Sequence, residues 1–293
     1  MRYSLRQMQI FREVAQQLSY TRAADTLNLT QPATFAQVRQ LEEHLGQKLI
    51  ERIGKTLHLT DVGRLVLHSA QHMLEEVDNL DMALAELDGL ARGRLRLSVV
   101  STAKYDMPRR IGAFIAAYPG IDVTLTVGNR EELMARFAAN ADDLYIFGTP
   151  PRELKAASRV FAKNPLVVIA PAGHALAGRA SLTLADLARY PFLTRESGSG
   201  TRLAVERAFD AAGVSPEKLI ELGANEAVKQ GVMSGLGLSV LSRSTIELEL
   251  RHGYLVELNI DSFPILRDWN VIWPEDKRLS RAAVAFLDGL ADP

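Results

Sequence analysis

Residues 61–90 contain no proline, and their two glycines, Gly63 and Gly89, stand near the ends. A stretch of this length without breakers predicts one long helix. Its apolar residues alternate at spacings of four and three, a heptad pattern typical of a helix that pairs with a copy of itself. A helix packed on its own domain is the alternative. The predicted dimerisation seam is Val66, Ala70, Met73, Val77, Leu80, Leu84 and Leu87.

The first 60 residues predict three short helices. Apolar side chains recur every three or four positions across residues 5–18, which indicates one buried stripe, and a second, shorter helix is expected over residues 20–28. The third is expected to begin after Thr30 as N-cap, with Pro32 in its first turn, and to stop at Gly46. Two helices joined by a tight turn, the second opening on hydroxyl and amide side chains, are typical of a helix-turn-helix.

A small hairpin is expected after these helices, because apolar and polar residues alternate on either side of Gly54. Basic residues near its tip would suit a wing that lies along a phosphate backbone. On this pattern alone, a plain three-helix bundle with a polar face is the alternative. The candidate DNA-binding residues are Thr21, Arg22, Thr30, Gln31, Pro32, Thr34, Phe35, Gln37, Arg39, Arg52 and Lys55.

Phe35 is an unexpected residue in the third helix. Helical spacing places it on the outer side with Gln31 and Arg39, while Val38 and Leu41 continue the inner stripe. Two hypotheses follow. The ring packs on thymine methyl groups in the major groove, or it folds back onto the turn or the wing.

Charge is distributed unevenly along the chain. The formal net charge is −1, but residues 1–60 hold eight Lys or Arg against five acids, and residues 61–93 hold two against seven. A mildly basic N-terminal region on an acidic stalk fits a local nucleic-acid footprint. A solvated surface would give the same excess.

Composition excludes several classes of protein. The chain has no cysteine, which excludes disulfides and thiol chemistry, and its six histidines suggest no pair at helical spacing beside a carboxylate. We therefore expect no metal and no cofactor. No apolar run reaches the roughly 18 residues of a membrane span, and the N-terminus does not resemble a signal peptide, so we expect a cytoplasmic protein without membrane association.

Residues 94–293 alternate between short apolar strands and amphipathic helices, which predicts an α/β fold with largely parallel sheet. Two segments at strand-to-helix turns suit anion binding. "STAKY" follows the first strand, and "RESGSGTR" precedes a helix with hydroxyl groups and two glycines. A simple turn and helix cap is the alternative for each. The predicted effector-binding residues are Ser101, Thr102, Lys104, Asn129, Arg130, Thr149, Arg195, Ser197, Ser199, Thr201, Arg202, Asn225 and Glu226.

The N-terminal region resembles the LysR-type transcriptional regulators through "TRAADTLNLTQPA", "LEEHLGQKLIER" and "LTDVG". The resemblance implies an all-α winged helix-turn-helix domain (1–60), a dimerising linker helix (61–90), a hinge (91–94) and an effector domain (95–293). The effector domain is expected to be similar to periplasmic binding proteins, with subdomain I at 95–163 and 268–293, subdomain II at 164–267, and the ligand between them. The implied partners are operator DNA, a small-molecule effector and further copies of the chain in a homodimer or homotetramer, and the family also leaves room for a contact with RNA polymerase.

Within this family, "STAKY", "GNRE", "PPREL", "RESGSGTR" and "GANEAVKQGVMSGLGLSVLS" resemble the regulators of the RuBisCO operon and Calvin-cycle genes. This resemblance implies an anionic effector, such as a phosphorylated sugar or a nicotinamide dinucleotide phosphate. Lys104, Arg130, Arg195 and Arg202 are the expected charge partners.

A ligand-responsive transcription factor is thus the leading hypothesis, and three others remain. The chain could regulate another pathway with a different effector, or be a ligand-binding module without DNA activity. An α/β enzyme is the third, but it lacks a thiol and a G-x-S-x-G elbow, and neither His174 nor His252 has an evident partner. We therefore expect no catalytic activity.

Overall fold

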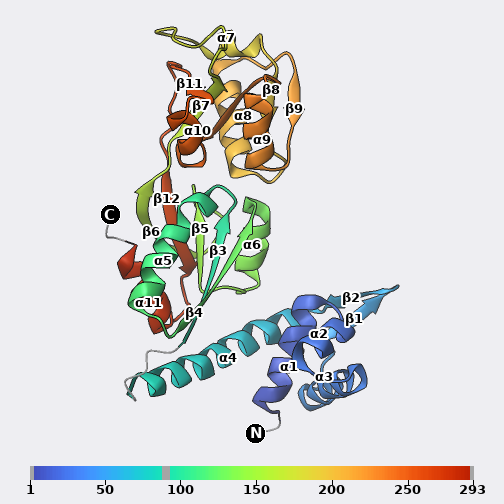
Figure 1. Cartoon of the computed structure of the whole chain (residues 1–293). Coiled ribbons are helices and arrows are strands. Elements are labelled where there is room, and N and C mark those ends of the chain that lie inside the picture. The colour runs from blue at the N-terminus through green and yellow to red at the C-terminus, as the bar shows by residue number, and fades with distance from the viewer. Residues whose placement is uncertain (1–2, 88–92, 291–293) are drawn as a thin grey trace. The chain divides into compact units, whose positions relative to one another are not determined.

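The computed structural model describes residues 3–87 and 93–290, and the chain divides into two compact units, Met1–Gly93 and Arg94–Pro293 (Figure 1). The first unit opens with three helices, α1 (Leu5–Gln17), α2 (Tyr20–Leu27) and α3 (Gln31–Leu45). The side chains of Ser4, Ser19 and Thr30 cap their N-termini by accepting backbone N–H groups, as Thr30 was predicted to do. The predicted helix-turn-helix is confirmed.

The predicted wing is also present. Strands β1 (Ile50–Ile53) and β2 (Thr56–Leu59) pair in antiparallel register, and Gly54 in the turn has a φ of 64°, a conformation that favours glycine. Beneath the helices lies a core that includes Phe11, Val14, Val38, Leu41 and Leu49.

The linker helix α4 is described over Asp61–Leu87, and the rest of the predicted helix, residues 88–90, lies outside the described residues. Its first half packs on α1, which corrects the predicted seam at Ala70, whose side chain is 0% exposed in the core of the first unit. Val66 and Met73 pack against the same core, as expected for the alternative of a helix packed on its own domain. Leu80 is 58% exposed, so it stays available to a second copy. The side chains of Leu84 and Leu87, and hinge residues 91–92, lie outside the described structure.

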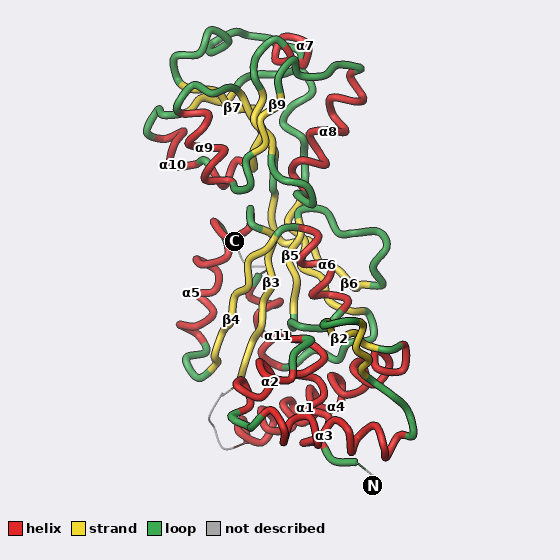
Figure 2. Tube along the Cα trace, turned by 90° about the vertical axis from the view of Figure 1, so that its right-hand side faces the viewer, coloured by secondary structure: helices red, strands yellow, loops and turns green. Residues whose placement is uncertain are grey.

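The second unit contains two sheets, which we call the first and second lobes. The first lobe has the strand order β4-β3-β5-β12-β6, and residues 93–163 and 268–274 supply its strands. They are β3 (Gly93–Val100), β4 (Ile121–Gly128), β5 (Leu144–Phe147), β6 (Ala156–Lys163) and β12 (Asp268–Pro274). Helices α5 (Met107–Ala117) and α6 (Arg130–Ala138) flank the strands on opposite sides, and α11 (Arg281–Gly289) packs beside α5 through Phe286 and Phe114 (Figure 2).

The second lobe has the strand order β11-β7-β10-β8-β9. Its strands are β7 (Leu166–Pro171), β8 (Phe192–Thr194), β9 (Leu219–Glu221), β10 (Leu238–Ser242) and β11 (Leu255–Glu257). Its helices are α7 (Leu184–Ala188), α8 (Gly200–Ala212), α9 (Asn225–Met233) and α10 (Glu247–Arg251). The chain enters this lobe after Lys163 and returns to the first at Asp268.

Both sheets are mixed, which corrects the expected largely parallel arrangement. Strand β12 runs antiparallel to β5 and β6, and β7 runs antiparallel to β10 and β11. Strands β6 and β11, both at sheet edges, had not been predicted from the sequence. The residues of β6 are all half-buried or exposed, so neither face of the strand needs apolar side chains and its sequence shows no apolar alternation.

Candidate functional site

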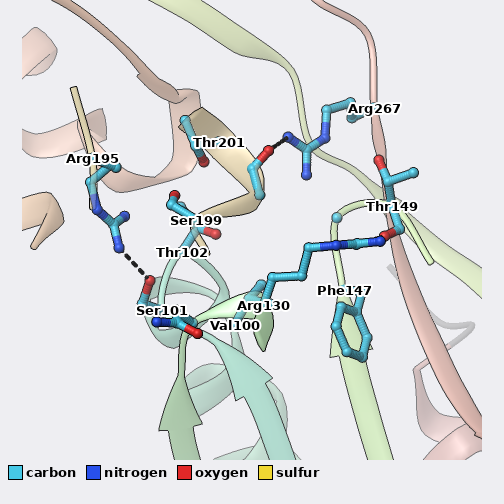
Figure 3. Close-up of a pocket in the computed structure, with 13 residues that line it drawn as sticks. Val100, Ser101, Thr102, Arg130, Phe147, Thr149, Arg195, Ser199, Thr201 and Arg267 are labelled. Carbon is cyan, nitrogen blue, oxygen red and sulfur yellow. Dashed lines mark hydrogen bonds between the residues drawn. The ribbon is translucent and has the colours of Figure 1, made fainter. Parts of the chain in front are cut away.

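A pocket lies between the two lobes, with an empty volume of about 340 Å³ that includes its open mouth (Figure 3). The first lobe contributes the ends of β3, β4 and β5, and the second contributes the loop that enters α8. The carboxyl ends of strands and the N-terminus of a helix are places where ligands commonly bind. The lining residues are Val100, Ser101, Thr102, Asn129, Arg130, Phe147, Gly148, Thr149, Arg195, Ser199, Gly200, Thr201 and Arg267.

Arg195 is only 4% exposed and is held from three sides. Its guanidinium donates two hydrogen bonds to Glu196 at 2.7 Å, one to the amide oxygen of Asn225, and one across the lobes to Ser101 Oγ at 3.0 Å. Because Glu196 already neutralises its charge, Arg195 lines the pocket mainly as a rigid donor.

Arg130 and Arg267 differ from Arg195, because neither forms an ion pair with a carboxylate of a described residue. Arg130 donates to the carbonyl oxygen of Thr149 at 2.6 Å, and Arg267 donates to that of Gly200 at 3.2 Å. Burial, followed by the positive charge of Arg130, lowers the pKa of Arg267 to about 10, and burial also lowers the pKa of Arg130. Both groups therefore stay charged at neutral pH. The Nε of Arg267 is buried without a hydrogen-bond partner.

Gly148 makes room for Arg267. A Cβ at this position would lie 2.2 Å from Arg267 Nη2 and 2.9 Å from Asn164 Nδ2. A Cβ on the neighbouring pocket residue Gly200 would find its nearest atom at 3.8 Å, an ordinary contact. A side chain at position 148 would therefore displace the Arg267 guanidinium, whereas a methyl group at position 200 has room.

Eight of the predicted effector residues line the pocket: Ser101, Thr102, Asn129, Arg130, Thr149, Arg195, Ser199 and Thr201. Five do not: Lys104, Ser197, Arg202, Asn225 and Glu226. Arg202, an expected charge partner, is instead bound to Glu206 at 2.7 Å and Glu221 at 2.6 Å. Asn225 holds Arg195 in place. The Nζ of Lys104 lies 5.1 Å from the centre of the Tyr105 ring, and Tyr105 donates its hydroxyl across the lobes to Glu226.

Arg267 is the functional candidate that sequence reasoning missed. It stands in no strand or helix and belongs to no recognisable motif. The sequence places Arg267 directly before Asp268, where a crossing between the lobes was predicted. Because a crossing segment borders the cleft, a cation there is a candidate anion ligand, and this is the one feature of the sequence that points to Arg267.

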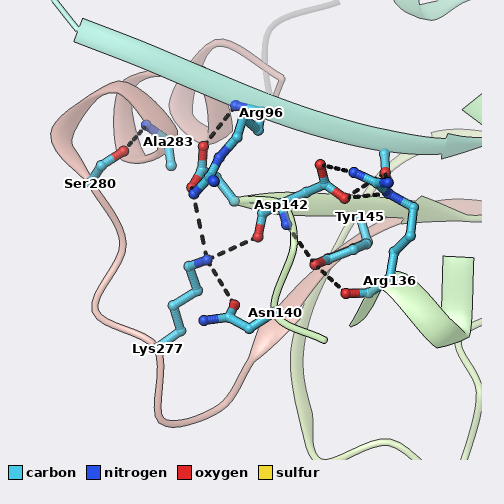
Figure 4. A network of polar contacts seen from close by, with 10 residues as sticks. Arg96, Arg136, Asn140, Asp142, Tyr145, Lys277, Ser280 and Ala283 are labelled. Atoms are coloured by element: carbon cyan, nitrogen blue, oxygen red, sulfur yellow. Dashed lines mark hydrogen bonds and ion pairs between the residues drawn. The ribbon is translucent and has the colours of Figure 1, made fainter. Parts of the chain in front are cut away.

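A second polar cluster in the first lobe shares no residue with the pocket (Figure 4). The buried Lys277 donates to Asn140 Oδ1 and to the carbonyl oxygen of Asp142, both at 2.9 Å. Arg136 donates to both carboxylate oxygens of Asp142 at 2.7 and 2.8 Å, and the hydroxyl of Tyr145 accepts the N–H of Asp142. The polar groups of this cluster pair with one another, and these pairs connect α6 and β5 to the segment before α11.

The candidate DNA-contacting face lies on α2, α3 and the wing. Gln31, Pro32 and Arg39 on α3 are exposed, and Arg39 lies 3.3 Å from Glu43. Thr34 requires a correction, because it is 0% exposed and its hydroxyl donates to the Thr30 carbonyl at 3.1 Å. It belongs to the inner side of the helix and cannot reach DNA.

The remaining predicted DNA contacts are accessible or half-buried. Thr21 and Arg22 on α2 are exposed, while Gln37 is partly covered. On the wing, Arg52 donates its Nε–H to the carbonyl of Gly54 at 3.1 Å, and Lys55 is exposed. A basic, exposed hairpin tip of this kind can follow a phosphate backbone.

Phe35 is 43% exposed, and its ring meets that of Tyr20 edge to face, with centroids 5.2 Å apart and planes at 67°. Its aromatic partner is therefore the first residue of α2, rather than a residue of the wing. The ring remains half open to solvent.

None of the helices in residues 3–87 and 93–290 is both long and apolar enough to span a membrane. In the same residues, no group of three or more His, Cys, Asp or Glu side chains could hold a metal ion. His68 and His72 on α4 do stand at helical spacing, with their Nε2 atoms 3.2 Å apart, but no carboxylate of a described residue joins them in such a group.

Comparison with known families agrees with both units. Residues 5–64 match the bacterial regulatory helix-turn-helix proteins of the lysR family, and residues 88–292 match the LysR substrate binding domain. The chain belongs to the LysR family. It is a LysR-type transcriptional regulator, with a DNA-binding domain followed by an effector-binding domain.

Among similar proteins are RuBisCO operon transcriptional regulators. That of Allochromatium vinosum is 46% identical over 288 residues, covering 98% of this chain and 95% of the relative. That of Acidithiobacillus ferrooxidans is 43% identical over 287 residues, covering 98% and 93%. A solved structure of the Synechocystis PCC6803 CcmR regulatory domain in complex with 2-PG is 46% identical, with a TM-score of 0.66, and covers 68% of this chain and 96% of that chain. Full-length CbnR complexed with its target DNA, at 22% identity and a TM-score of 0.63, shares the fold.

Proposed function

We propose that this regulator controls carbon-fixation genes in response to a small phosphorylated acid, which binds in the pocket between the lobes. The observation that carries the proposal is the pair Arg130 and Arg267, two half-buried cations of the pocket, neither of which forms an ion pair with a carboxylate of a described residue. Bringing two like charges together in a partly desolvated pocket is unfavourable until an anion enters. A doubly charged phosphate would relieve that repulsion.

The other lining groups suit the same ligand. Ser101, Thr102, Ser199 and Thr201 offer hydroxyl groups, and the N-terminus of α8 offers backbone N–H groups. Among anionic ligands, we favour a compact acid over a dinucleotide. The complex of the CcmR regulatory domain with 2-PG supports this choice. Binding would involve no catalytic step.

Isothermal titration calorimetry with 2-phosphoglycolate tests the proposal, with glycolate, inorganic phosphate and a nicotinamide dinucleotide phosphate as comparisons. We expect 2-phosphoglycolate to bind most tightly and Arg267→Met to weaken it at least tenfold, since a charged hydrogen bond contributes about 1.5–3 kcal/mol. Arg189→Met, at an exposed position of the second lobe, is the matched control. Equal binding by the Arg267→Met variant would contradict the role of this residue, and tighter binding of the dinucleotide would contradict the effector class.

We propose further that the chain acts on operator DNA as a homodimer through α4, and that dimers pair into a homotetramer in contact with RNA polymerase. In a two-fold dimer, two copies of α3 would read half-sites about one turn of DNA apart. Light scattering of the purified chain, alone and with operator DNA, measures the number of copies. A monomer at micromolar concentration would contradict the dimer.

A further inference from the structure

The first half of α3 presents an exposed face with one large apolar side chain. Around Phe35, which is 43% exposed, the residues Gln31, Pro32, Ala36 and Arg39 are exposed as well. Val38 and Leu41, on the inner side of the same helix, are buried. An exposed aromatic ring on the helix that enters the major groove is poorly suited to binding phosphate, because it has no hydrogen-bond donor.

The ring is also fixed in position. The ring of Tyr20 meets it edge to face, with the two ring centroids 5.2 Å apart, and Tyr20 itself packs against the core formed by α1, α3 and α4. Aromatic pairs in this arrangement attract each other beyond simple burial. The contact with Tyr20 covers only part of the Phe35 ring, so the rest of the ring can contact DNA. The orientation of the ring depends on Tyr20 of α2 as well as on α3.

We propose that Phe35 is a specificity-determining residue that packs on the C5-methyl group of a thymine in the operator, and that Tyr20 is its positioning residue. The inference rests on the DNA-binding function of the family. Thymine is the one base that presents a methyl group in the major groove, and apolar side chains, phenylalanine among them, recognise it by contact. The contribution of Phe35 is therefore tied to a base, and it does not depend on salt as a phosphate contact does.

Deoxyuracil provides a direct test, because it differs from thymine only by the missing methyl group. The probe is a duplex selected from a random pool by the full-length protein, in which each thymine is then replaced singly by deoxyuracil. We expect one position in each half-site to lose about fourfold in affinity, the effect of about one buried methyl group. In Phe35→Ser that sensitivity should disappear at the same position and persist at any others.

Three variants separate positioning from folding and from general affinity. Tyr20→Phe keeps the ring and should keep the sensitivity to deoxyuracil, whereas Tyr20→Leu should reduce it while DNA is still bound. Arg52→Ala on the wing should weaken binding to the thymine and deoxyuracil duplexes equally and flatten the salt dependence. Thermal unfolding of each variant confirms that the helices remain folded.

The outcomes are distinguishable. Affinity that is unchanged by every deoxyuracil replacement, or sensitivity that is identical in Phe35→Ser, overturns the methyl contact while leaving DNA binding intact. A ring that packs on a sugar would give the same loss on every sequence in Phe35→Ser, and this result also overturns the proposal. Failure of the selection to enrich any sequence would overturn the sequence-specific DNA binding on which the proposal rests.

Discussion

At the scale of single residues, function depends on which charges are already neutralised. Four basic residues were expected to bind the effector, but Arg195 and Arg202 are each bound to carboxylates, and Lys104 lies against an aromatic ring. Arg130 keeps its place in the pocket, where it is joined by Arg267. A basic side chain is a good anion ligand only when its charge is not already paired within the protein.

Gly148→Ala should weaken effector binding at least tenfold, because the new Cβ would collide with the end of the Arg267 side chain. The loss in thermal stability should be small, since the flexible end of the side chain can move away. Calorimetry with 2-phosphoglycolate measures the first effect, and differential scanning calorimetry measures the second. Gly200→Ala is the control, because it has room for a methyl group, and an equal loss in both variants would contradict the steric explanation.

Gln31→Ala should weaken binding to the selected operator by about 1–3 kcal/mol and relax specificity at one base position, and Arg39→Ala should weaken binding as well. Thr34→Val should leave base preference unchanged, because Thr34 is buried. Quantitative gel shifts at several salt concentrations measure these effects. Unchanged affinity in both Gln31→Ala and Arg39→Ala would contradict the prediction that these two side chains contact DNA.

At the scale of elements, α4 combines two roles that its heptad pattern does not separate. Its first half completes the core of the first unit, where Ala70 is buried, while Leu80 further along is exposed. One continuous apolar stripe can serve both roles, because packing on α1 and pairing with a second copy both require apolar residues at spacings of three and four.

Leu80→Asp and Ala70→Leu should therefore have different effects. Leu80→Asp should weaken the dimer while leaving the unfolding midpoint of the monomeric species nearly unchanged, because a charge would enter the proposed seam. Ala70→Leu should destabilise the first unit by about 1–3 kcal/mol through overpacking. Analytical ultracentrifugation and thermal unfolding distinguish the two. A dimer unaffected by Leu80→Asp would place the pairing surface elsewhere.

At the scale of the effector-binding unit, three hydrogen bonds between described residues join the lobes near the pocket. Arg195 donates to Ser101, Tyr105 donates to Glu226, and Arg267, on the crossing segment, donates to Gly200 of the second lobe. The loop that carries Ser101 and Tyr105 follows β3 and also lines the pocket through Ser101 and Thr102. A ligand that binds both lobes adds to these contacts and stabilises the same arrangement.

Tyr105→Phe should lower the unfolding midpoint of the ligand-free protein by about 2–4 °C, because the hydrogen bond to Glu226 is lost. The rise on adding 2-phosphoglycolate should remain, since Tyr105 does not line the pocket. At 100 times the dissociation constant that rise corresponds to about 2.7 kcal/mol. Differential scanning fluorimetry with and without ligand measures both, and loss of the ligand effect would make Tyr105 part of the binding site.

The sequence by itself determined the local structure and the family. Helix stripes, the caps at Thr30 and Gly46, the wing around Gly54 and the α/β alternation all follow from interactions between residues close in the chain, which periodicity and turn chemistry reveal. The tertiary structure decided which arginines keep their charge available. Arg202 meets Glu221, 19 positions away, and Arg267 meets Gly148 and Gly200 across far longer separations. The first pairing depends on how the second lobe folds, and the contacts of Arg267 depend on how the two lobes meet; neither leaves a periodic signal in the chain.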